Sequence, residues 1–111
     1  MRNQDVSISK AKKAISDYRK AVGHPEGIAE LMVFYCESCW DFLGSCGMED
    51  GGFFDALILM FGQALKMIAK LEPAQRKAFV DRLERVRHEA RNWGWGVNDA
   101  MDDLMEEYGP A

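Results

Sequence analysis

Hydrophobic residues recur along most of the chain with the three- and four-residue spacing of an amphipathic α-helix. Five segments show this spacing, and Gly or Pro residues lie between most of them. The predicted helices cover residues 7–22, 25–43, 53–71, 73–93 and 98–108. Because short connections favour antiparallel neighbours, we predict an all-α fold, a single bundle of five helices packed as antiparallel α-hairpins.

The apolar faces differ in width between the five segments. Segment 53–71 is apolar over about half of its circumference, which predicts that it is the central helix of the bundle. Gly23 is expected to stop the first helix, and residues 44–52 are expected to form a glycine-rich loop. The side chains expected to face the core include Ile8, Ala11, Ile15, Tyr18 and Val22, then Ile28, Leu31, Met32, Tyr35, Cys39, Phe42 and Leu43, then Phe53, Phe54, Leu57, Ile58, Met60, Phe61, Leu65 and Ile68, then Phe79, Leu83, Val86, Ala90 and Trp93, and finally Met101, Leu104, Met105 and Tyr108.

Length and composition fit one globular domain over residues 1–111. A chain of 111 residues is long enough to bury one core, and even its long uninterrupted apolar runs, such as residues 56–61, are far too short for a membrane span. The first residues show no secretory pattern and the three cysteines are an odd number, so we expect reduced thiols and a cytoplasmic protein. The net charge of −4 argues against nucleic acid or an anionic membrane as a partner.

Charge is distributed in blocks along the chain. Residues 1–20 carry six basic side chains, whereas residues 21–65 carry seven acids and neither Lys nor Arg. On the second predicted helix the acids Glu26, Glu30, Glu37 and Asp41 form one stripe opposite the apolar face. The stripe is either a solvated surface or a partner face, neutralised by the basic side of the first helix, within the chain or in a second copy, or by a basic protein.

Cysteine spacing gives an alternative reading of the same helix. Cys36 and Cys39 have the spacing of metal-binding and redox pairs, and Cys46 with His24 would complete a set of four zinc ligands. However, Cys39 lies on the predicted apolar face and Cys36 at its edge, mid-helix, where cysteine behaves as a small hydrophobe. We therefore expect structural thiols and no metal or other cofactor.

The remaining patterns also favour structural interpretations. His88 begins a near match to a zinc-protease motif, but Asn92 stands where the second histidine is needed. Gly94 and Trp95 predict a helix stop followed by an aromatic anchor. The acids of segment 98–108 are expected to form a solvated face rather than a cation site, and they are Asp99, Asp102, Asp103, Glu106 and Glu107.

A spaced pattern over most of the chain resembles an uncharacterised family of small helical bacterial proteins. It comprises Lys13-Ala14-Ile15, residues 30–35, residues 53–64, and Gly94-Trp95-Gly96 followed by Asp99 and Asp103. The resemblance implies a helical fold and carries over no functional residue. The sequence thus favours a non-enzymatic protein-interaction module with an acidic surface, with a metal- or thiol-dependent protein using Cys36, Cys39, Cys46 and His24 as the alternative.

Overall fold

A computed structural model describes the backbone of residues 3–46, 51–91 and 96–109, together with the side chains of residues 9–20, 23–38, 54–91 and 96–109. The described backbone is all-α, as predicted. Its helices are α1 (Asn3–Val22), α2 (Pro25–Cys46), α3 (Gly51–Ile68), α4 (Pro73–Ala90) and α5 (Val97–Tyr108).

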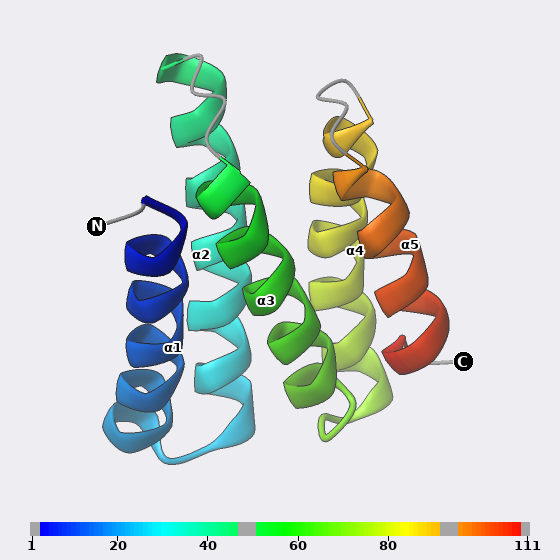
Figure 1. Cartoon of the computed structure of the whole chain (residues 1–111). Coiled ribbons are helices and arrows are strands. Elements are labelled where there is room, and N and C mark those ends of the chain that lie inside the picture. The colour runs from blue at the N-terminus through cyan, green and yellow to red at the C-terminus, as the bar shows by residue number, and fades with distance from the viewer. Residues whose placement is uncertain (1–2, 47–50, 92–95, 110–111) are drawn as a thin grey trace.

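The helices form two layers, α1, α3 and α5 over α2 and α4. Helix α3 contacts α1 and α5 within its own layer and α2 and α4 in the other, so it is the central helix predicted from its wide apolar face. Successive helices run in opposite directions, which leaves α2 and α4 parallel to each other and side by side (Figure 1). Helices α1 and α5 lie at opposite flanks of the bundle.

Local sequence explains where several helices begin and end. Helix α1 stops before Gly23, which takes a left-handed backbone conformation with φ of 78° that a side chain would disfavour. The next helix begins with Pro25 in its first turn, and the backbone N–H of Gly27 donates to Nδ1 of His24 at 3.3 Å. His24 therefore caps α2.

The connection between α2 and α3 is shorter than predicted. Gly44 and Cys46 belong to the last turns of α2, and Gly51 already belongs to α3. Glycine costs only about 1 kcal/mol relative to alanine in a helix interior. Tertiary packing, which supplies most helix stability, is able to outweigh that cost.

The core agrees with the predicted faces in α3 and α4 and departs from them in α2. Phe79, Leu83, Val86 and Ala90 of α4 are buried, as expected. In α2, by contrast, Ala29 and Val33 are fully buried although they were not expected on the apolar face. Cys36, expected at the edge of that face, is fully buried as well. The reason is that α2 packs against α1, α3 and α4 at once, so that its buried face is wide. None of the helices in the described part of the chain combines the length and apolar character needed to cross a bilayer.

Candidate functional site at the α2–α4 surface

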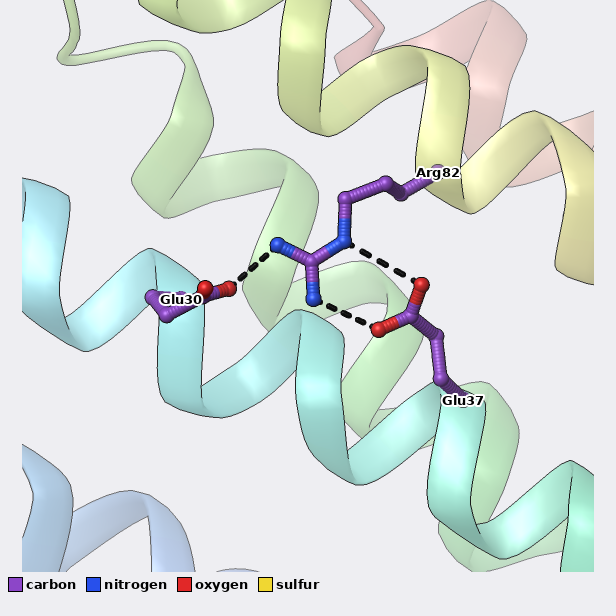
Figure 2. A network of polar contacts seen from close by, with 3 residues as sticks. All are labelled: Glu30, Glu37 and Arg82. Carbon is purple, nitrogen blue, oxygen red and sulfur yellow. Dashed lines mark hydrogen bonds and ion pairs between the residues drawn. The ribbon is translucent and has the colours of Figure 1, made fainter.

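The acidic stripe of α2 meets an arginine that comes from α4. Arg82 donates to Glu37 twice, from Nε to Oε2 at 3.1 Å and from Nη2 to Oε1 at 2.5 Å. Its remaining terminal nitrogen, Nη1, donates to Oε2 of Glu30. One guanidinium therefore bridges two carboxylates that lie two helical turns apart (Figure 2).

Electrostatics and packing hold this arginine in one position. Hydrogen bonding to Glu37 raises the pKa of Arg82; partial burial opposes the rise and Glu30 adds to it. The guanidinium carbon lies 5.7 Å from the centre of the Phe79 ring, one turn earlier on α4. Arginine is better suited than lysine both to bidentate pairing with a carboxylate and to stacking on an aromatic ring. The arrangement, which we call the Arg82 clamp (Arg82, Glu30 and Glu37), fixes α4 against α2.

The structure thus identifies a basic residue within the chain that pairs with the acidic stripe and was not predicted from the sequence. The expected sources were the basic first helix, of the same chain or of a second copy, and a basic protein, whereas the base observed is Arg82 of α4. Glu26 lies exposed in the first turn of α2, where the helix dipole favours a negative charge. Asp41 is on α2, but its side chain is outside the described residues. A partner for the stripe as a whole stays a prediction.

A groove with a volume of about 350 Å³ opens beside the clamp between α2 and α4. Val86 is 4% exposed and contributes a buried apolar side chain to its lining, whereas Phe34 is 58% exposed at its edge. The polar lining residues are Glu37, Ser38, Arg82, Arg85 and Glu89. An aromatic ring surrounded by charged groups is typical of a small protein-binding surface.

Phe34 is the residue of this site that sequence reasoning missed. It follows Glu30 by four positions and precedes Glu37 by three, so all three lie on the same side of α2. Among the described residues it is the one large hydrophobic side chain that is exposed. An aromatic residue on an otherwise acidic helical face was the signal that would have identified it.

A second arginine joins α4 to α5. Arg87 donates to Asp102 of α5 and, from Nη2 to Oε2 at 2.5 Å, to Glu84. Hydrogen bonds to Glu84 and, to a smaller extent, to Asp102 raise the pKa of Arg87. Asp102 therefore has a structural role, while Asp99 and Asp103 are exposed beside it.

The four proposed zinc ligands are spread along one helix. His24 caps the start of α2, and the fully buried Cys36 lies near its middle. Cys46 is ten residues further on, about 15 Å along a straight helix axis. Residues spread this far along one helix do not surround a single ion. The side chains of Cys39 and Cys46 are outside the described residues. Within the part of the chain that is described, no three His, Cys, Asp or Glu side chains gather to hold a metal ion.

The other sequence motifs add no chemistry to this surface. His88 is exposed on α4, as expected for a solvated histidine. Gly94 and Trp95, the predicted stop and anchor, lie outside the described residues, and it is Gly96, with φ of 71°, that precedes α5 in a left-handed conformation. Comparison of the chain with protein-family models, curated proteins and solved structures finds no match.

Proposed function

We propose that this protein is a non-enzymatic interaction module that binds another protein through the groove between α2 and α4. The observation that carries the proposal is the exposed ring of Phe34 beside that groove. Burial of one aromatic side chain by a partner removes a large apolar area from water, and such residues dominate the energetics of many interfaces.

The charged groups around Phe34 fit the outer part of such an interface. The Arg82 clamp is already satisfied within the chain, so it provides a rigid wall without demanding a new partner. Arg85 and Glu89 remain at the groove for contacts that select the partner. Charges of this kind mainly set association rate and specificity.

The acidic face of α2 extends the proposed surface. Glu26 and Glu30 are exposed, and Glu37 contributes to the groove itself. We propose that Glu26, Glu30, Glu37 and Asp41 belong to the polar rim of this partner-binding surface, next to the groove. No described contact favours the metal- or thiol-dependent alternative built on Cys36, Cys39, Cys46 and His24.

Photo-crosslinking tests the proposed surface directly. A photoreactive phenylalanine analogue at Phe34 should form covalent adducts with a protein in cells, because the ring would lie inside the interface. The same analogue at Lys12, exposed on α1 in the other layer, serves as the control position. Adducts that form equally well at both positions, or at neither, would contradict the proposal.

A further inference from the structure

The α2–α4 groove carries opposite charges on either side of an apolar centre. Arg85 and Glu89 both line it and lie one helical turn apart on α4. Neither takes part in a side-chain hydrogen bond or an ion pair with another residue of the described part of the chain. Phe34 and Val86 supply the apolar part of the same lining. The groove therefore presents an exposed cation, an exposed anion and an exposed aromatic ring.

From this arrangement we infer that a second copy of the chain occupies the groove in a two-fold symmetric dimer. The inference rests on the proposed interaction function and names its partner. An interface with two-fold symmetry must be self-complementary, since the same patch is used on both sides. A patch with one exposed positive and one exposed negative group meets this requirement, whereas a purely acidic or basic peptide would match only one of them.

The two-fold geometry pairs the charges twice. An axis perpendicular to α4, midway between positions 85 and 89, places the two α4 helices antiparallel across the interface. Arg85 of one copy then faces the partner's Glu89, and its Glu89 faces the partner's Arg85. Phe34 of each copy packs near the axis against the apolar lining of the other. Because α2 and α4 form one layer, the dimer would join two two-helix layers face to face.

A different self-association is the main competitor. Helix α1 is predominantly basic and α5 predominantly acidic, and they lie at opposite flanks, so copies could also associate head to tail. However, among the described residues the one exposed large hydrophobic side chain is Phe34 of α2. The described parts of α1 and α5 therefore expose no such side chain. Exposed ion pairs alone contribute little, so the apolar centre favours the α2–α4 surface.

Sedimentation equilibrium on the purified full chain tests the dimer. Wild type should show a monomer–dimer equilibrium, and Phe34→Ser should weaken it by about tenfold or more. Arg85→Glu and Glu89→Arg should each weaken it by about tenfold, because each places like charges together twice. Lys70→Glu, a charge reversal on the exposed turn after α3, is the matched control and should leave the equilibrium unchanged.

Two combinations distinguish this interface from general charge effects. Mixing the Arg85→Glu and Glu89→Arg proteins should produce a heterodimer tighter than either homodimer, and the double variant should regain most of the wild-type association. Circular dichroism should show unchanged helicity, since Arg85 and Glu89 are exposed. Chains that stay monomeric at about 1 mM would overturn the dimer.

Association that resists these substitutions but is weakened by Glu106→Lys with Glu107→Lys would also overturn it, in favour of head-to-tail contact. The proposed function can hold without the dimer. A monomeric chain that still crosslinks another protein through position 34 would refute the dimer and leave the interaction function standing. A chain that neither dimerises nor crosslinks would refute both.

Discussion

Tyr18 lies half-buried on α1, and burial is the main reason that its pKa is raised above the ordinary value of 10.0. Electrostatic interactions with Cys36 and Asp17 raise that pKa further. The native state thus holds the phenolic proton more tightly than the unfolded chain does. Its contribution to stability is complete below the unfolded pKa and is lost as pH rises through the folded pKa.

We therefore expect the free energy of unfolding to fall more steeply with pH in wild type than in Tyr18→Phe above about pH 10. Urea denaturation of both proteins at several alkaline pH values measures the difference. The other tyrosines are common to the two proteins and cancel in the comparison. Parallel curves would contradict the raised pKa of Tyr18.

Cys36 is fully buried in the core, which makes it a packing residue. Cys36→Ala should lower the free energy of unfolding by about 1 kcal/mol or more, because it leaves a small cavity. Urea denaturation provides the measurement, and Ser38→Ala, on the exposed side of the same helix, is the control. Stoichiometric metal in protein purified without added metal would contradict a purely structural role for the thiols.

At the scale of elements, the Arg82 clamp ties α4 to α2 and its strength is measurable. Arg82 and Glu37 have side chains only 23% and 33% exposed and pair through two hydrogen bonds. A double-mutant cycle with Arg82→Met and Glu37→Gln should give a coupling energy of about 1–2 kcal/mol in denaturation experiments. The pair Lys77 and Asp81, 80% and 59% exposed, is the control and should couple far more weakly. Equal coupling in the two pairs would count against a structural clamp.

Helices α3 and α5 approach closely at Gly62. A Cβ atom placed there would lie 3.3 Å from Cδ2 of Leu104 on α5. Gly62→Ile should therefore destabilise the protein by about 1–3 kcal/mol through overpacking, measured as a lower denaturation midpoint. Gly62→Ala is the matched control, because a small shift of the half-buried Leu104 accommodates one methyl group and alanine favours helix. Equal stability of the Ile variant would show that the two helices separate easily.

The elements themselves were largely predictable, whereas the site between them was not. The stripe formed by Phe79, Leu83, Val86 and Ala90 followed from helical periodicity and is buried as predicted. Arg82 as the base for Glu30 and Glu37 did not follow, because α2 and α4 are not consecutive in the sequence. Periodicity assigns a side chain to a face of its own helix, but it does not identify the helix that packs beside that face.

Charge at the scale of the whole molecule is asymmetric. Helix α1, at one flank, carries most of the basic residues of the first block, and α5, at the other, carries five acids and no base. Asp102 is the acid of α5 that pairs with Arg87, and Tyr108 receives Lys66 over its ring, 4.8 Å from the centroid. These two contacts offset part of the repulsion among the carboxylates of α5.

The layered arrangement predicts an order of opening. Among the described helices, α3 contacts all the others, whereas α5 is the shortest and contacts α3 and α4 alone. Amides of α3 should therefore exchange with solvent only through global unfolding, and those of α5 through a less costly local opening. Arg87→Met removes the ion pair between α4 and α5. It should speed exchange of the α5 amides by roughly tenfold, while the α3 amides change only by the loss of global stability. Hydrogen exchange followed by mass spectrometry measures this, with Arg91→Met, at the exposed end of α4, as the control. If α3 and α5 are equally protected in wild type, and Arg87→Met accelerates both by the same factor, the bundle opens as one unit and α5 has no independent opening.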